Sequence, residues 1–435
     1  MDPDAIVGGL QTGPIVLGKV LFLLGPHPGL SAPPAGTEAV VILNPGRGSW
    51  VERLRQAGFT HAREYRLRPG LRELRWFVPA SSLAGGAGMQ VYTPSSWRGH
   101  VLKLAAHLSL AFRGSHLLVA LREPPVLEST LARILGVQSV CLAFSTGTPG
   151  IHNKTTGLVM TDRGKVLGYA KIASESPAMA CLRNEVRTLL RLEQVGALRA
   201  QVPRVIGTFA HGEAEGVVTS PGPAQPAGAA FSSVHLSFLR ALQQATGRTV
   251  LFGESLMWRS IQTEYAALCG LISPEWQSRL DSAIAVLEDS LCHDVLHTAL
   301  AHRDFTPWNK RRLDGDRLYA FDWEYAREEY SPWYDYFHFN LMSTLLVRRA
   351  PSVKAAARWL DGVRALGGHR TELLFLAYLV DVALSYLYAR VARADSQDDS
   401  VLRYVADLFD RRSEWCGRGG LERRRPACLA PSPEP

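Results

Sequence analysis

The chain has 435 residues, enough for two or three domains, and its hydrophobic and charged fractions of 46% and 20% are ordinary for a globular protein. Its net charge of +8 suits a nucleotide, a phosphorylated acceptor or an anionic membrane surface, but it is too small to indicate nucleic-acid binding, and the sequence has no nucleic-acid-binding motif. The six cysteines form no Cys-x-x-Cys pair, the N-terminus lacks the layout of a signal peptide, and no uninterrupted apolar run is long enough to span a bilayer. We therefore expect a cytoplasmic protein without a structural zinc site.

The first part of the chain, residues 1–136, predicts an α/β accessory domain of unknown role. Apolar runs at 20–24 and 39–43 predict buried strands, and 49–58 predicts a helix. The second strand, the turn 44–48 and this helix follow the layout of a βα phosphate turn, but the third glycine of that motif is missing. We interpret the turn as structural rather than as a second nucleotide site.

Two further segments are interpreted from composition alone. The apolar, mildly basic segment 97–113 is typical of a core helix; a membrane-surface helix is the alternative, which its thin polar face disfavours. The tail 413–435 is rich in glycine, proline and arginine and is expected to be disordered.

Residues 137–222 predict a small β-rich domain that carries a strand lysine and a helix glutamate. The segment 164–172 is typical of a strand and contains Lys171 near its end. The helix that follows has apolar residues at helical spacing and carries Glu185 in its middle. Kinase-type sites hold the nucleotide phosphates with such a lysine, which a helix glutamate holds in turn. Because these elements precede the motif at residues 302–309, we predict an ion pair between Lys171 and Glu185 at a nucleotide site, with Glu175 as a second candidate glutamate. A surface lysine and a solvated glutamate are the alternative.

A loop that contains Gly147 and Gly150 lies between two strand patterns of the same domain. The backbone N–H groups of glycine-rich loops cover nucleotide phosphates in many proteins. This loop is neither a Walker loop nor the full glycine-rich kinase signature, so an ordinary hairpin loop is the alternative. We predict a phosphate loop here and place the hinge between the two lobes near residues 219–223.

The larger domain, 223–412, is predicted to be mostly helical and contains the most informative motif of the chain. Asp304 is followed five residues later by Asn309, and a short predicted hairpin leads on to Asp322. Phosphoryl transfer from ATP needs such a set, because one carboxylate orients and deprotonates the attacking hydroxyl while an amide oxygen and a second carboxylate hold magnesium. We predict Asp304 as the base and Asn309 and Asp322 as the Mg²⁺ ligands. His302 is interpreted as a support of the loop.

These motifs resemble the aminoglycoside phosphotransferase and choline kinase branch of the protein-kinase-like superfamily. The resemblance depends on the spacing from His302 to Asn309, on Asp322-Trp323-Glu324, and on Asp335 within the segment 330–339. It implies an α+β, two-lobed protein-kinase-like fold with a small β-rich lobe and a larger helical lobe. It also implies that ATP and Mg²⁺ are used to phosphorylate a hydroxyl of a small molecule, such as a sugar, amino sugar or amino alcohol. Asp335 would hold the backbone of the catalytic loop.

Arg303 is the residue within the motif that leaves the acceptor in dispute. The branch usually has glycine between the histidine and the aspartate, whereas protein kinases have arginine. A protein kinase is therefore one alternative, and a non-catalytic kinase-like binding or scaffold protein is another. The short spacing from Asp322 to Asp335 leaves no room for a long activation segment, and no Ala-Pro-Glu sequence follows, which favours a small acceptor. The sequence does not indicate an oligomeric state.

Overall fold

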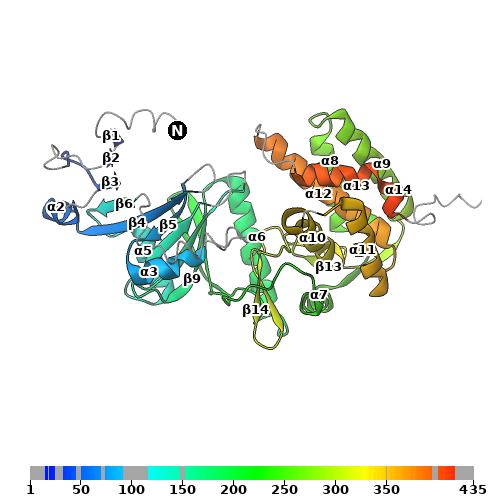
Figure 1. Ribbon diagram of the computed structural model, residues 1–435, viewed down its shortest axis with the longest axis horizontal. Helices are drawn as coiled ribbons and strands as arrows, with labels where there is room; N and C mark the ends of the chain where they lie inside the picture. The colour runs from blue at the N-terminus through cyan, green and yellow to red at the C-terminus, as the bar shows by residue number, and fades with distance from the viewer. Residues whose placement is uncertain are drawn as a thin grey trace, which may run out of the picture. The chain divides into compact units, whose positions relative to one another are not determined.

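The computed structural model describes residues 15–17, 19–24, 33–45, 50–69, 74–91, 116–146, 152–348, 350–393 and 400–416. The chain divides into two compact units (Figure 1). The first, Met1–Val186 with Pro203–Gly222, is built on a large sheet and is called the β-rich unit here. The second, Arg187–Val202 with Pro223–Pro435, is called the helical unit. The predicted α+β class is confirmed.

The β-rich unit contains an 11-stranded sheet. In spatial order its strands are β1 (Ile15–Leu17), β2 (Val20–Leu24), β3 (Ala39–Leu43), β6 (His116–Leu121), β4 (His61–Pro69), β5 (Leu74–Pro79), β7 (Cys141–Ser145), β8 (Thr155–Met160), β9 (Val166–Ala173), β11 (Ala214–Thr219) and β10 (Val205–His211). β2 and β3 pair in parallel, and the other neighbours pair antiparallel. Because β5 pairs with β7 through Phe77 and Phe144, the N-terminal strands and the later strands form one sheet. The domain boundary at residue 136 stays a prediction.

The helices of this unit cover the sheet with apolar faces. They are α2 (Trp50–Gln56), α3 (Ser82–Gly88), the short η1 (Met89–Val91), α5 (Val126–Leu135) and α6 (Ser176–Glu193), which continues into the helical unit. Trp50 and Leu54 of α2 pack on the buried residues of β2, β3 and β6, where alternate side chains face the helix. Leu131 of α5 packs on β7, β8, β9 and β11 in the same way. The predicted strands at 20–24 and 39–43 and the predicted helix after them are thereby confirmed.

Several sequence predictions fall on residues outside the described ranges. They are the apolar segment 97–113, the loop with Gly147 and Gly150, most of the turn 44–48, and the tail beyond residue 416. These stay predictions. The boundary between the two units, at Gly222 and Pro223, falls within the segment that the sequence indicated as a hinge.

The helical unit is formed by helices that surround a small antiparallel sheet. Its helices are α7 (Ser233–Thr246), α8 (Leu256–Leu268), α9 (Pro274–Ser290), α10 (Tyr334–Met342), α11 (Ser352–Ala365), α12 (Thr371–Arg393), α13 (Ser400–Asp410) and α14 (Arg412–Trp415), with short turns η2 (Phe252–Glu254) and η3 (Ser343–Arg348). Its sheet has the order β12 (Arg248–Leu251), β13 (Val295–Ala301), β16 (Arg327–Tyr330). A separate hairpin joins β14 (Lys310–Leu313) to β15 (Arg317–Ala320), as the sequence predicted.

α12 is the central helix of this unit. It contacts α8, α9, α10, α11 and α13 (Figure 1). Nearly all of its apolar side chains from Leu373 to Leu387 are buried. Within the described residues it is also the one helix long and apolar enough to cross a membrane, but 72% of its most apolar window is buried inside the structure. The buried core helix of a globular protein can have the same length and apolar composition. α12 also carries a buried aspartate, Asp381, in the middle of this apolar sequence.

Candidate active site

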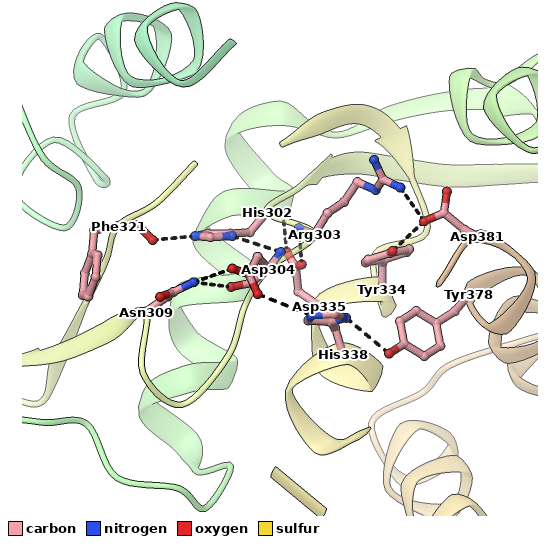
Figure 2. A network of polar contacts seen from close by, with 10 residues as sticks. All are labelled: His302, Arg303, Asp304, Asn309, Phe321, Tyr334, Asp335, His338, Tyr378 and Asp381. Atoms are coloured by element: carbon pink, nitrogen blue, oxygen red, sulfur yellow. Dashed lines mark hydrogen bonds and ion pairs between the residues drawn. The ribbon is translucent and has the colours of Figure 1, made fainter. Parts of the chain in front are cut away.

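The loop that the sequence predicts to be catalytic, residues 302–309, begins where β13 ends and is called the catalytic loop below. Ala299 to Ala301 are buried, so the strand carries the chain out of the core directly into His302. The His302 ring is fully buried, and its Nδ1 accepts a hydrogen bond of 3.3 Å from the Asp304 N–H. Its Nε2 therefore carries the proton and donates to the Phe321 carbonyl oxygen at 3.0 Å (Figure 2).

The electrostatic surroundings of His302 are consistent with a supporting role. Burial lowers the pKa of His302, and the carboxylates of Asp335, Asp304 and Asp322 offset only part of that effect. The ring is therefore neutral and uses both nitrogens to hold the loop. These contacts are those of a structural residue and not of a proton carrier.

The buried side chain of Asp335 holds the backbone of the loop. It lies in the first turn of α10, and its two oxygens accept from the His302 N–H at 2.8 Å and the Arg303 N–H at 2.9 Å (Figure 2). Burial raises the pKa of Asp335, while His302 and these two N–H groups favour its ionised form. The contact predicted from the sequence, between Asp335 and the loop backbone, is confirmed.

The side chains of Asp304 and Asn309 contact each other at the partly exposed side of the loop. The Asn309 Nδ2 group donates to Asp304 Oδ2 at 2.6 Å and to the Asp304 carbonyl oxygen at 3.1 Å. Asn309 is 5% exposed, whereas the Asp304 side chain is 27% exposed. The amide nitrogen is thus used on Asp304, and the amide oxygen is the atom of Asn309 that is left for a cation.

The β14–β15 hairpin brings Asp322 back to the loop. Lys310 pairs with Ala320, and the Phe321 N–H donates to the Asn309 carbonyl oxygen at 3.1 Å, so Asp322 follows directly after the residue that contacts Asn309. The backbone of Asp322 has a left-handed φ of +73°. Such a conformation is uncommon outside glycine and is found at functional sites where the surroundings enforce it. Here the buried Trp323 ring contributes, since its Nε1 donates to the Ala320 carbonyl oxygen at 3.0 Å.

The predicted donors, Asn309 and Asp322, suit magnesium better than a transition metal. An amide oxygen and a carboxylate are hard oxygen ligands, and Mg²⁺ is usually held by one or two carboxylates together with substrate phosphates. Among the residues that the structure describes, no group of three or more His, Cys, Asp and Glu side chains could hold a metal ion. A site that depends on Asn309 and Asp322 would therefore need phosphate oxygens to complete it.

In the β-rich unit, the ion pair predicted between Lys171 and Glu185 is present. β9 is paired on both sides, with Lys171 opposite Thr156 of β8 and Val217 of β11. Lys171 Nζ lies 2.5 Å from Glu185 Oε1, and the two side chains are 11% and 1% exposed. A carboxylate buried to this degree needs a charged partner, which Lys171 supplies. The role of the pair at a nucleotide stays a prediction, as does that of Gly147 and Gly150.

Arg303 turns away from the open side of the loop and into the core. Its φ of +64° is a conformation that glycine adopts freely and that costs other residues about 1–2 kcal/mol. The guanidinium group is 8% exposed and lies 2.7 Å from the carboxylate of Asp381 on α12, which is 1% exposed (Figure 2). It also lies over the rings of Tyr330 and Tyr334, whose hydroxyls donate to Asp381 at 3.1 and 2.6 Å. The buried ion pair thus explains how arginine is accommodated at a backbone position suited to glycine.

Two residues of this network were not singled out from the sequence. Asp381 gave a usable signal, because an aspartate inside an otherwise apolar helix needs a buried partner. His338, on α10 three residues after Asp335, gave none, since one histidine in an aromatic helix is ordinary. Both lie within the network around the catalytic loop (Figure 2).

Comparisons with known proteins return matches among solved structures. No family model matches the chain, and no curated protein matches it. A thermostable mutant of the aminoglycoside phosphotransferase APH(4)-Ia, solved with ADP and hygromycin B, is 12% identical, with 66% of this chain and 99% of that chain covered and a TM-score of 0.47. Choline kinase LicA from Streptococcus pneumoniae is 16% identical, with 66% and 100% covered and a TM-score of 0.44. The GDP complex of aminoglycoside 2'-phosphotransferase-IIIa is 14% identical, with 65% and 96% covered and a TM-score of 0.45.

These solved structures are of aminoglycoside phosphotransferases and a choline kinase, the group that the sequence motifs resemble. With identities of 12–16% and TM-scores of 0.44–0.47, these matches carry no argument about this chain. What this chain does depends on its own residues.

Proposed function

We propose that this chain is an ATP- and Mg²⁺-dependent phosphotransferase that phosphorylates a hydroxyl group of a small molecule. The observation that carries the proposal is the arrangement of Asp304, Asn309 and Asp322 on one loop and one hairpin. Asp335 and His302 hold that loop from the buried side. A catalytic base, an amide ligand and a carboxylate ligand in this order are the parts that phosphoryl transfer uses.

Asp304 would act as the base. Its side chain is 27% exposed, and a substrate hydroxyl can therefore reach it. Asn309 orients it by donating to Oδ2. The acceptor hydroxyl would give its proton to Asp304 as its oxygen attacks the γ-phosphorus and ADP leaves. Asn309 and Asp322 would hold the Mg²⁺ ion, which offsets the charge that develops on the phosphate oxygens.

The nucleotide would depend on the β-rich unit as well. Lys171, held by Glu185, is the residue that we propose for contact with the phosphates. The glycine loop with Gly147 and Gly150 is proposed to cover them. Each of these assignments concerns the nucleotide and not the acceptor.

The surroundings of Arg303 favour a small acceptor over a protein. In kinases regulated by phosphorylation, arginines pair with the phosphorylated residue of the activation loop. Arg303 is buried and already paired with Asp381, so it is not available for such a partner. The residues from Asp322 to Asp335 are taken up by a turn, by β16 paired with β13, and by the start of α10, which leaves no activation segment. A sugar, amino sugar or amino alcohol is the acceptor class that we propose.

The test is an ADP-release screen of the purified protein with Mg²⁺-ATP over a library of hydroxylated metabolites. We expect turnover with at least one acceptor, and we expect Asp304→Ala to lower kcat by about 10²–10⁴-fold, since that is the usual contribution of a general base. Nucleotide affinity, measured by calorimetry, should not change in that variant. The matched control is Asp314→Ala, because Asp314 is an exposed aspartate at the tip of the neighbouring hairpin.

The outcomes separate the three functions that the sequence left open. Transfer to a protein and to no metabolite would make the chain a protein kinase. Binding of Mg²⁺-ATP with no turnover on any acceptor would favour a non-catalytic binding module. Undiminished turnover in Asp304→Ala would remove Asp304 as the base.

A further inference from the structure

His338 lies beside the proposed base, and the reaction described above gives it no role. It is on α10, three residues after Asp335, so both side chains lie on the same face of that helix. Its side chain is 6% exposed. Its Nε2 lies 3.6 Å from Asp304 Oδ1 and has no hydrogen-bond partner among the described residues. A buried ring nitrogen is thus directed at the one Asp304 oxygen that Asn309 does not bind (Figure 2).

The other side of the ring is held by α12. His338 Nδ1 is 3.3 Å from the hydroxyl of Tyr378, which is fully buried. Burial holds the pKa of Tyr378 well above its usual range, so this hydroxyl keeps its proton. The phenol can donate its proton to Nδ1 when the ring proton is on Nε2, and this is the direction that the proposal below uses. A neutral imidazole then carries its proton on Nε2, which faces Asp304.

The orientation of the ring is fixed by aromatic neighbours. Tyr334 stacks on it with centroids 6.3 Å apart and planes 15° apart, and Tyr378 meets it edge-on at 6.1 Å and 79°. Rotation of the imidazole about its χ2 bond would disturb both contacts. The ring is therefore confined to the plane in which Nε2 faces Asp304 Oδ1.

We propose that His338 is a positioning residue for Asp304, with Tyr378 setting the tautomer that makes this possible. Asn309 holds Oδ2 and the N–H at His338 Nε2 holds Oδ1, so the carboxylate cannot turn about its broad χ2 minimum. The separation of 3.6 Å is longer than a hydrogen bond, but contacts of catalytic groups are often this long before the substrate binds and shorten in the complex. The inference rests on the proposed function, since it assigns Asp304 as the base.

The kinetic test uses two substitutions at one position. His338→Leu removes the donor, and we expect kcat to fall about 10–100-fold with the KM for ATP unchanged, the usual cost of losing a partner that orients a functional group. His338→Gln places an amide nitrogen near the position of Nε2, and we expect most of the activity to return. His293→Leu, at an exposed histidine, is the matched control and should have no effect.

Tyr378 gives an independent check on the same chain of contacts. Tyr378→Phe removes the hydroxyl and keeps the ring, so it should lower kcat less than His338→Leu does. The double variant should be no slower than His338→Leu alone, because Tyr378 is proposed to act on Asp304 only through His338. Equal losses in the Leu and Gln variants, or additive losses with Tyr378→Phe, would mean that His338 only fills space.

A spectroscopic measurement separates this inference from the proposed function. Long-range ¹⁵N–¹H spectra of the full chain, with His338 assigned by the signal missing in His338→Gln, should show the Nε2–H tautomer. They should also show a changed Nε2 shift in Asp304→Ala. A protein that turns over no acceptor but passes this test would refute the proposed function and leave the His338–Asp304 contact standing. An Nδ1–H tautomer, or a signal that ignores Asp304→Ala, would overturn the inference.

Discussion

The buried ion pair between Arg303 and Asp381 makes a sharp stability prediction. Asp381→Asn keeps the size of the side chain but removes its charge, so the buried guanidinium of Arg303 loses the carboxylate that lies 2.7 Å from it. The two partners are 8% and 1% exposed, so water cannot compensate. Removing one partner of such a pair costs about 3–5 kcal/mol. We expect about 3 kcal/mol for this variant, the lower end of that range, because the asparagine oxygen can still accept from Tyr334 at the position of Oδ2.

The measurement is urea unfolding followed by tryptophan fluorescence, with thermal unfolding as a second readout. A loss of about 3 kcal/mol lowers the melting temperature of a unit of this size by about 6–12 °C. Arg303→Met should cost a similar amount, because it leaves the Asp381 carboxylate buried. The double variant should be less destabilised than the sum of the two, by about 2 kcal/mol, because neither unpaired charge remains.

The control is the same chemical change at an exposed ion pair. Asp361 is 74% exposed and pairs with Arg364, so Asp361→Asn should change the free energy of unfolding by less than about 1 kcal/mol. A loss below 1 kcal/mol for Asp381→Asn would refute the reasoning. So would a double variant whose loss equals the sum of the single losses.

Two buried bases of the helical unit give the remaining predictions. Burial lowers the pKa of His235 from 6.5 to about 3, so between these values the unfolded chain binds a proton that the folded chain does not, and stability falls as the pH falls. The free energy of unfolding falls by about 2 kcal/mol from pH 7 to pH 5 for this reason. His235→Asn, whose amide oxygen can replace Nδ1 as an acceptor, should remove that part of the pH dependence, as measured by urea unfolding. An unchanged dependence of the unfolding free energy on pH would contradict this. Lys310 Nζ is buried between the rings of Phe305 and Phe339, at 4.0 and 3.7 Å from their centroids, and burial holds the pKa of Lys310 well below its usual range. In the unfolded chain Lys310 is protonated up to about pH 10.5, so this lysine destabilises the fold at neutral pH and does so less as the pH rises. Lys310→Met should therefore raise the free energy of unfolding by about 1–3 kcal/mol at pH 7 and by less at pH 10. An equal gain at both pH values would refute the explanation.

Some features of the candidate site could be predicted because they depend on near neighbours in the sequence. The six residues from Asp304 to Asn309 span one tight loop, and a turn of three residues closes the hairpin that returns Asp322 to it. Lys171 and Glu185 are only 14 residues apart, on a strand and the helix that follows it. Their patterns of polar and apolar residues fix which way each element faces, so their meeting follows from local structure.

Other features depend on contacts between residues far apart in the chain. Arg303 and Asp381 are 78 residues apart, and Tyr378 meets His338 across 40 residues. No local pattern says that α12 will pack behind the catalytic loop, because many helices with an apolar surface could fill that space. The sequence alone therefore left Arg303 as an argument for a protein acceptor, whereas its buried partner makes it a structural residue.

By itself the sequence of this protein determined the α+β class, the loop and hairpin that carry Asp304, Asn309 and Asp322, and the elements that carry Lys171 and Glu185. Spacing and periodicity along the chain encode these features. The tertiary structure alone decided what lies behind the loop and how the sheet is joined. The pairing of β5 with β7 merges the N-terminal strands into one sheet with the later ones, and the packing of α12 supplies Asp381 and Tyr378. The physical reason is that burial of charge and choice of strand partner are settled by the packing of the whole unit, which no short segment contains.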